Sequence, residues 1–249
     1  MTPSICQQLI VGVVTCENRE LNTLNTTLAM AQIAGCAASL VQFDTVNLGA
    51  WGNWRACLKR LVDLADAGKY RFLLVLEDDA VLSSGLAKYL ETFSLAHDVI
   101  YSLYCANGSP ANKIFREWNF GFHEVEAPRL SWGALAYLMH IDLARKILAN
   151  PPFPDRKDGT DHAIGVFCKT NKIPYLVHFP SLVKHIGAIS SLEEVGGNNE
   201  YRQAKYWVSD CHEGRIAVVE ELRPPIVFRS GQPNESSGSV DRDGQNAMG

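Results

Sequence analysis

The chain has 249 residues, of which 47% are hydrophobic and 20% are charged, so its composition is that of a globular domain rather than a disordered or fibrous chain. Its formal net charge of −4 does not favour a general nucleic-acid-binding surface. No apolar run approaches the roughly 20 residues of a membrane helix and no secretory signal opens the chain, so we expect a cytoplasmic protein without membrane insertion.

Strands and helices alternate in the first third of the chain. The predicted strands are short apolar runs, and the predicted helices carry apolar residues at helical spacing and end at a glycine. They are strands at 9–14, 37–43 and 72–76 and helices at 21–34 and 54–67. This order is typical of parallel strands joined by right-handed crossovers. We therefore expect an α/β fold with a mixed, mostly parallel sheet flanked by helices.

The remaining elements extend the same pattern. They are predicted helices at 83–95, 141–150 and 160–171 and strands at 99–105, 131–140, 175–179 and 182–186. From residue 224 the composition shifts towards Gly, Ser, Pro, Asn and Asp. We therefore expect one domain over residues 1–223 and a flexible tail over 224–249.

Three carboxylates, Glu77, Asp78 and Asp79, directly follow the apolar run at 72–76. That run predicts a strand buried on both faces, and open α/β folds bind ligands at the carboxyl ends of such strands. Adjacent carboxylates repel one another, and Mg²⁺ or Mn²⁺ would compensate their charge because these ions favour oxygen ligands. In the alternative interpretation, the two aspartates cap a following helix.

Two segments together resemble a known family. The segment LLVLEDDAVL at 73–82 resembles the acidic DxD-type metal-binding motif of GT-A glycosyltransferases. The segment PSLVKHIGAISSL at 180–192 resembles the region around the late histidine of N-acetylglucosaminyltransferase IV and related bacterial and phage enzymes. The resemblance implies a GT-A fold, with His185 as a metal ligand beside Glu77 and Asp79, and Asp78 facing the donor. Glu77 stands where the strict motif has Asp, which leaves open which carboxylate meets the ion first.

Asp161 is the candidate catalytic base. An inverting sugar transfer needs a carboxylate to accept the proton of the acceptor hydroxyl. In the family such an acid lies near the start of a late helix, and Asp161 opens the predicted helix at 160–171 after a loop rich in Pro and Gly. Asp155 and Asp158 are nearby competitors. An acid placed in the first turn by the helix dipole is an equally good interpretation.

Candidate donor-binding residues follow the first two strands and precede the second helix. Thr15, Glu17 and Arg19 come after the first strand, where GT-A enzymes contact the nucleotide or diphosphate, and arginine suits phosphate through its fork of donors. Asp44 follows the second strand and Asn53 lies in the loop before the helix at 54–67. Each of these is alternatively an ordinary loop residue.

The sequence thus predicts a metal-dependent glycosyltransferase that uses a nucleoside-diphosphate sugar, with UDP as the favoured nucleotide and inversion as the favoured outcome. Its acceptor is either a surface-glycan precursor or a hydroxymethylated pyrimidine in phage DNA. One alternative is a nucleotidyltransferase, although no Gly-rich basic loop follows the first strand. Another is a non-catalytic module that binds nucleotides or sugars, and the oligomeric state is open.

Overall fold

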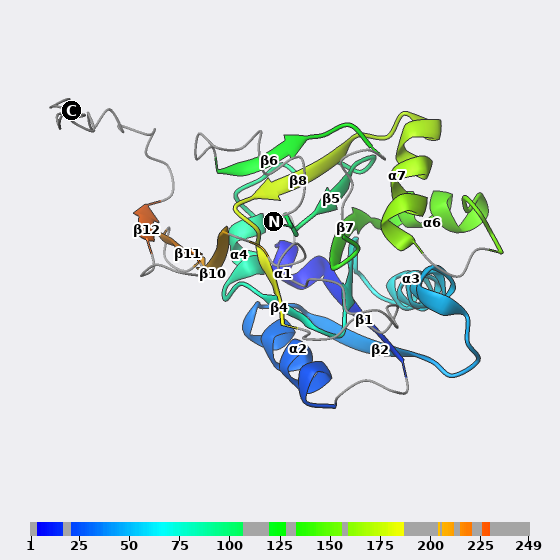
Figure 1. The fold of residues 1–249 in the computed structure, drawn as a ribbon, viewed down its shortest axis with the longest axis horizontal. Helices are drawn as coiled ribbons and strands as arrows, with labels where there is room; N and C mark the ends of the chain where they lie inside the picture. The colour runs from blue at the N-terminus through cyan, green and yellow to red at the C-terminus, as the bar shows by residue number, and fades with distance from the viewer. Residues whose placement is uncertain are drawn as a thin grey trace, which may run out of the picture.

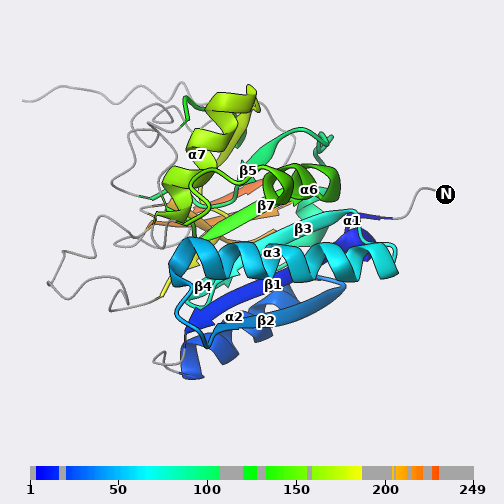
Figure 2. The ribbon, with the colours of Figure 1, turned by 90° about the vertical axis from the view of Figure 1, so that its right-hand side faces the viewer.

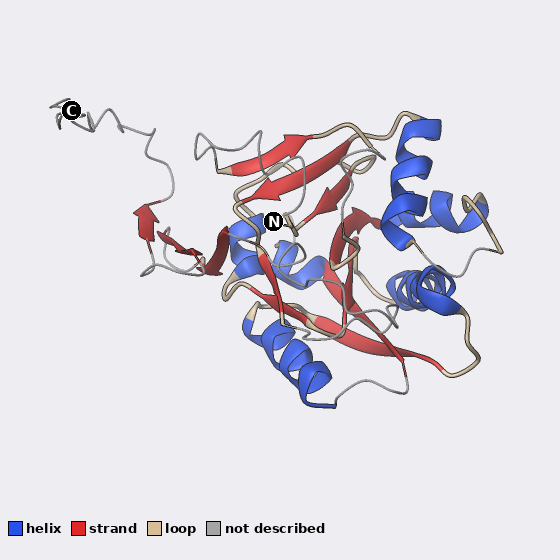
Figure 3. Cartoon of the chain, in the orientation of Figure 1, coloured by secondary structure: helices blue, strands red, loops and turns tan. Residues whose placement is uncertain are grey.

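Helices and strands alternate through the first half of the chain (Figures 1 and 3). The computed structural model describes residues 4–16, 21–106, 120–127, 133–155, 159–186, 204, 206–211, 215–220 and 226–229. The helices are α1 (Ile5–Gln8), α2 (Leu21–Ile33), α3 (Gly49–Ala67), α4 (Leu86–Leu90), α6 (Ile141–Ala149) and α7 (Thr160–Asn171). The strands are β1 (Leu9–Cys16), β2 (Ala38–Asp44), β3 (Phe72–Glu77), β4 (Ala80–Leu82), β5 (Ile100–Ser102), β6 (Gly121–Glu124), β7 (Ala136–His140), β8 (Tyr175–Phe179), β9 (Val183–His185), β10 (Tyr206–Asp210), β11 (Arg215–Glu220) and β12 (Ile226–Arg229).

A seven-stranded sheet with the order β2-β1-β3-β7-β5-β8-β6 forms the centre of the fold. Strands β1, β2, β3, β5 and β8 run in one direction, and β6 and β7 run in the opposite direction. The prediction of a mixed, mostly parallel sheet flanked by helices is confirmed. The carboxyl ends of the five parallel strands therefore lie along the same edge of the sheet.

The central strand β3 is buried on both faces, as its unbroken apolar run predicts. Leu73 and Val75 pack into the layer that contains α3, α6 and α7, which cover one face of the sheet in Figure 2. Leu74 and Leu76 pack into the opposite layer with residues of α2 and α4. Alternate side chains of one strand thus anchor both layers.

Glycine at position 12 lets α3 lie close to β1. A Cβ atom at Gly12 would lie 2.4 Å from Sγ of Cys57 and 2.9 Å from Cδ1 of Leu61, both on α3. This close approach brings the first turns of α3 next to the carboxyl end of β1, where Asn53 donates a hydrogen bond to the carbonyl oxygen of Thr15.

The segment after the three acids differs from its prediction. The sequence predicts a helix that is capped by Ser83 or Ser84 and runs to about Leu95, but residues 80–82 form β4, and α4 spans only Leu86–Leu90. The Ser83 hydroxyl lies within hydrogen-bond distance of the carbonyl oxygens of Leu182 and Val208, and its proton is shared between them instead of capping a helix. Strand β4 pairs antiparallel with β9, which joins the acids to a distant part of the chain.

The last strands form a separate three-stranded sheet of the order β10-β11-β12. Ala204, Val208 and Cys211 are buried in the layer with α2 and α4, and the Val208 N–H donates to the Ser181 carbonyl oxygen. Strand β12 falls inside the predicted tail and pairs with β11, whereas residues 230–249 lie outside the described residues. Within the described part of the chain, no helix combines the length and apolar character needed to span a membrane.

Candidate active site at the carboxyl edge of the sheet

Glu77 ends β3, and Asp78 and Asp79 form the turn that leads into β4. Asp78 is 2% exposed and Asp79 is 1% exposed. Parallel pairing places Val14 of β1 opposite Glu77, so the end of β1 lies beside the acids. Carboxylates buried this deeply are costly unless hydrogen bonds or opposite charges compensate them, and the surrounding elements supply such partners.

Two threonine hydroxyls hold Asp78 in place. Thr15, near the end of β1, donates a hydrogen bond of 2.5 Å to Oδ2 of Asp78. Thr27, fully buried on α2, donates a hydrogen bond of 2.9 Å to the main-chain carbonyl oxygen of Asp78. The residue between Glu77 and Asp79 is therefore fixed from two different elements.

Asp79 meets His185, as the resemblance implies. Ala80 pairs with His185 across β4 and β9, and the Ile186 N–H donates to the Asp79 carbonyl oxygen at 2.9 Å. Nε2 of His185 lies 3.2 Å from Oδ2 of Asp79. This separation suits a direct hydrogen bond, and it also suits two adjacent ligands of one octahedral cation, which lie about 3 Å apart when each bond is about 2.1 Å.

Glu77 is the third predicted ligand. Its carboxylate oxygens do not lie close enough to the ligand atoms of Asp79 and His185 to form a group of three within 4.8 Å. Among the described residues, the three side chains whose ligand atoms all lie within 4.8 Å of one another are His97, His140 and Asp142. At the carboxyl edge, the donor set of carboxylate oxygen and imidazole nitrogen from Asp79 and His185 is nevertheless one that Mn²⁺ accepts.

Asp161 lies at the same edge of the sheet as the acids. Its Oδ2 accepts a hydrogen bond of 3.1 Å from the Gly133 N–H, and its Oδ1 accepts one of 2.8 Å from the His162 N–H. Gly133 lies just before β7, and Leu135 of the same segment accepts a hydrogen bond from the Glu77 N–H. The start of β7 thus connects Asp161 to the end of β3.

Two buried tyrosines lie near Asp161 and were missed at the sequence level. The hydroxyls of Tyr137 and Tyr175 are 3.4 Å apart. Burial, followed by the Tyr175 and Asp161 charges, raises the pKa of Tyr137, and burial raises the pKa of Tyr175. Both hydroxyls therefore stay neutral. Each tyrosine stands in an apolar strand, where the sequence pattern indicates only core packing.

The predicted donor-binding residues Asp44 and Asn53 have different surroundings. Oδ1 and Oδ2 of Asp44 accept hydrogen bonds from the N–H groups of Leu48 and Gly49, at 2.7 and 2.8 Å, and so cap the start of α3. Asn53 is buried, and its Oδ1 has no hydrogen-bond partner among the described residues. Glu17 and Arg19 lie outside the described residues.

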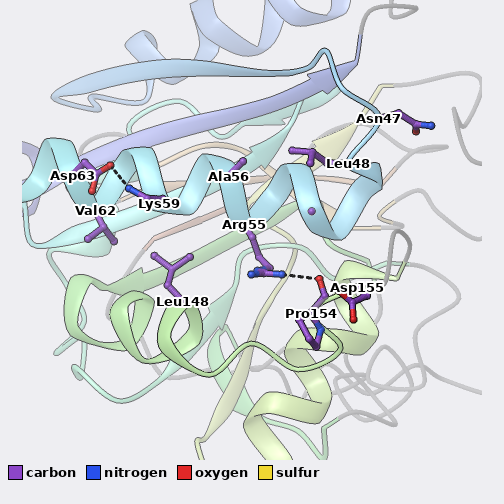
Figure 4. Close-up of a pocket in the computed structure, with 11 residues that line it drawn as sticks. Asn47, Leu48, Arg55, Ala56, Lys59, Val62, Asp63, Leu148, Pro154 and Asp155 are labelled. Carbon is purple, nitrogen blue, oxygen red and sulfur yellow. Dashed lines mark hydrogen bonds and ion pairs between the residues drawn. The ribbon is translucent and has the colours of Figure 1, made fainter.

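A groove of about 680 Å³ lies elsewhere, along the outer side of α3 (Figure 4). Within it Arg55 donates a hydrogen bond of 3.0 Å to the Pro154 carbonyl oxygen, and Lys59 pairs with Asp63 at 2.8 Å. None of Glu77, Asp78, Asp79, Asp161 or His185 lines this groove. The candidate site is therefore identified by its buried ionisable groups rather than by this hollow.

No protein-family model matches the chain, and no curated protein matches it in sequence. Three examples of the solved structures that match the chain are the following. A protein from STIV is 17% identical with a TM-score of 0.46, over 74% of this chain and 86% of that one. A glycosyltransferase involved in glycosylation of the major capsid of PBCV-1 is 11% identical with a TM-score of 0.46, over 73% and 94%. A mutant of Drosophila β-1,4-galactosyltransferase 7, in complex with manganese, UDP-Gal and xylobiose, is 9% identical with a TM-score of 0.48, over 90% and 93%.

Two of these three structures are thus glycosyltransferases. At such identities and TM-scores the likeness establishes neither a family nor an activity for this chain. The case for a function depends on the residues at the carboxyl edge of the sheet.

Proposed function

We propose that the protein is a metal-dependent glycosyltransferase with a GT-A-type fold, which transfers a sugar from a nucleoside-diphosphate sugar to a hydroxyl acceptor. The observation that carries this proposal is the meeting of Asp79 with His185 at the carboxyl end of β3. Two short motifs far apart in the sequence predict this contact, and the pairing of β4 with β9 makes it.

The cation would be Mn²⁺ or Mg²⁺, held by Asp79 and His185 with Glu77 as a third ligand, and it would neutralise the departing diphosphate. Asp78 and Thr15 lie against this site through their mutual hydrogen bond. Asn53 offers its buried Oδ1 as an acceptor for a donor hydroxyl or N–H group. We assign Glu17 and Arg19 to contacts with the nucleotide and diphosphate. Asp44 acts in donor binding by fixing the first turn of α3.

Asp161 acts as the base in an inverting transfer. The acceptor hydroxyl oxygen forms a bond to the anomeric carbon while the bond from that carbon to the diphosphate oxygen breaks. The hydroxyl proton passes to the Asp161 carboxylate, whose orientation is fixed by the N–H groups of Gly133 and His162. Because attack and departure take place on opposite faces of the sugar, the anomeric configuration inverts.

UDP is the nucleotide that we favour for the donor. The acceptor is a surface-glycan precursor or a hydroxymethylated pyrimidine in phage DNA, and a cytoplasmic location suits both. A DNA acceptor would need its target base extruded from the stack and a basic groove for the backbone. Parallel assays with both kinds of acceptor distinguish them.

The test is release of nucleoside diphosphate from a panel of nucleotide sugars in the presence of Mn²⁺, with the glycan and DNA acceptors included. We expect release with a uridine donor and a loss of at least about 100-fold in kcat in Asp79→Asn, because removing a ligand of the cation forfeits several kcal/mol of charge stabilisation. Asp63→Asn is the matched control, since Asp63 is an exposed acid on α3 that pairs with Lys59.

A lack of release with every donor and metal, together with unchanged nucleotide binding in Asp79→Asn, would overturn the proposal. Thermal unfolding of each variant is measured alongside, so that loss of fold is not taken for loss of chemistry.

A further inference from the structure

We propose that His97, His140 and Asp142 form a second cation site, separate from the acids, that binds a divalent transition-metal ion of the zinc class. His140 ends β7 and pairs with Phe72, the first residue of β3, whereas Glu77 is the last residue of β3. The two sites therefore lie at opposite edges of the sheet, about 17 Å apart along a strand that rises about 3.3 Å per residue.

The ligand atoms of this cluster are close enough to share one ion. One atom from each of the three side chains lies within 4.8 Å of the other two. Nδ1 of His140 lies 3.3 Å from Oδ2 of Asp142. Two ligands of a tetrahedral zinc ion, with bonds of about 2.0 to 2.1 Å, are separated by about 3.3 to 3.4 Å, so this pair has the required spacing. A bound ion would replace the Asp142 N–H as the partner of the Nδ1 lone pair.

His97 supplies the third ligand from the segment between α4 and β5. Its ring is parallel to that of His140, with 3.7 Å between ring centroids and 4° between planes. Two parallel rings cannot both direct a nitrogen lone pair at one ion, so binding requires the His97 ring to turn. His97 is exposed, which leaves its side chain room for that rotation, while the buried His140 stays in place.

A neighbouring side chain orients the carboxylate of the cluster. Nη1 of Arg145 donates to Oδ1 of Asp142 at 2.8 Å, which leaves Oδ2 on the side of His140, as outer partners commonly do for ligating carboxylates. The imidazole nitrogens bind metal in their neutral form.

A purely structural role accounts for part of the cluster. His140 caps α6, since its Nδ1 accepts the Asp142 N–H at 3.3 Å. This capping contact does not explain why the exposed His97 is stacked on His140. The positive charges of Arg71 and Arg145 oppose a cation, so we expect weaker binding than at a structural site with four protein ligands. The cluster offers two imidazole ligands where the site at the acids offers one, and imidazole ligands favour zinc, nickel or copper over Mg²⁺.

The test uses the full-length protein, stripped of metal by a chelator, and Zn²⁺ alone as titrant in calorimetry. In the Asp79→Asn background, which removes a ligand of the site at the acids, we expect one zinc site that is weakened at least about tenfold by His97→Ala and by Asp142→Asn. Asp79→Asn retains this site, since the acids lie elsewhere, and His162→Ala, which removes another exposed histidine, retains it too. Co²⁺ titration, followed by absorption, should show no thiolate-to-metal charge transfer, because no cysteine belongs to the cluster.

Zinc bound to the native state also raises its melting temperature. The rise should occur in the wild-type protein and be smaller in His97→Ala at the same zinc concentration, and the exposed position of His97 makes a folding defect a poor explanation. Equal zinc stoichiometry and affinity in wild type, His97→Ala and Asp142→Asn would overturn the proposal, as would an equal loss in His162→Ala. Neither readout involves sugar transfer, so the result is independent of the proposed function.

Discussion

Asp78 differs from the two carboxylates beside it in what surrounds it. Its side chain and its carbonyl group are both held by threonine hydroxyls, whereas Asp79 faces His185 and Glu77 ends the strand. The direction in which the outer two acids point depends on the residue between them. We therefore expect Thr27, which donates to the Asp78 carbonyl oxygen, to position the proposed cation site without touching the ion.

Replacing Thr27 by Val removes the hydroxyl while keeping the shape, and Thr27→Ser keeps the hydroxyl. We expect Thr27→Val to weaken Mn²⁺ binding by about tenfold, because loss of an outer hydrogen bond commonly costs 10- to 100-fold in metal affinity. Electron paramagnetic resonance of free Mn²⁺ measures this without a substrate. A purely structural role predicts a lower melting temperature with equal Mn²⁺ affinity in Thr27→Val and Thr27→Ser, which would contradict the expectation.

At the scale of single residues, the sequence predicts the acids and the histidine of the candidate site, but it does not predict the residues that hydrogen-bond to them and fix their positions. The contact of Asp79 with His185 follows from two recognisable segments, because each carries a distinctive pattern. Thr27 carries none, since a threonine inside a helix of mixed polarity looks the same whether or not it reaches a carbonyl group. The residues that support the site come from packing of α2 against the acidic turn, which no local pattern encodes.

At the scale of elements, α3 shows how a side chain outside a helix sets where it begins. The sequence predicts a loop over 47–53 because Gly49 and Gly52 are poor helix formers. The helix nevertheless begins at Gly49, since the Asp44 carboxylate accepts the first free N–H groups. Strand β4 was missed for a related reason, because three residues carry no periodicity and their partner β9 lies far along the chain.

Asp44→Ala should lower the free energy of unfolding by about 1 kcal/mol, the usual cost of losing a helix cap. Asp44→Asn should lose less, because one amide oxygen still accepts an N–H. Urea unfolding measures both, with Asp63→Ala on the same helix as the control for losing an exposed ion pair, which contributes little. An Asp44→Ala protein as stable as wild type would show that the cap does not stabilise α3.

At the scale of the whole molecule, burial makes stability depend on pH. His178 on β8 is fully buried, and its Nδ1 donates to the Pro180 carbonyl oxygen at 2.6 Å. Because a carbonyl oxygen only accepts, Nδ1 carries the proton, and Nε2 accepts from the Tyr89 hydroxyl at 3.1 Å. Burial lowers the pKa of His178 to about 3, although the Pro180 carbonyl acts in the other direction.

The unfolded chain therefore binds a proton at His178 below about pH 6.5, whereas the folded chain does so near pH 3. Stability should be unaffected by this group above pH 6.5 and should fall by about 1.4 kcal/mol per pH unit below it, until about pH 3. Urea unfolding between pH 7.5 and 4.5 measures the slope. His178→Gln should have a smaller slope whatever its absolute stability, and an equal slope in the two proteins would contradict the assignment.

The overall plan of the fold could be predicted because β1, β2 and β3 are strongly apolar and helices separate them. The sequence predicted no strand at β10, β11 or β12, since residues 204–229 mix polar and apolar side chains without a clear period. Val208 shows the consequence, because it is buried only once β10 lies against Ser83 and Ser181. Such contacts between distant segments form only when the core packs, so the local sequence pattern does not predict them.

The pairing of β4 with β9 also fixes when, during synthesis, the site is assembled. Glu77, Asp78 and Asp79 leave the ribosome first, and at about 5 to 20 residues per second the histidine follows roughly 5 to 20 s later. Until then the acidic turn lacks its partner strand, and a contact between such distant segments forms slowly. A nascent chain that has completed β1, β2 and β3 therefore carries the acids without His185, so the proposed cation site lacks one of its ligands until β9 has been synthesised.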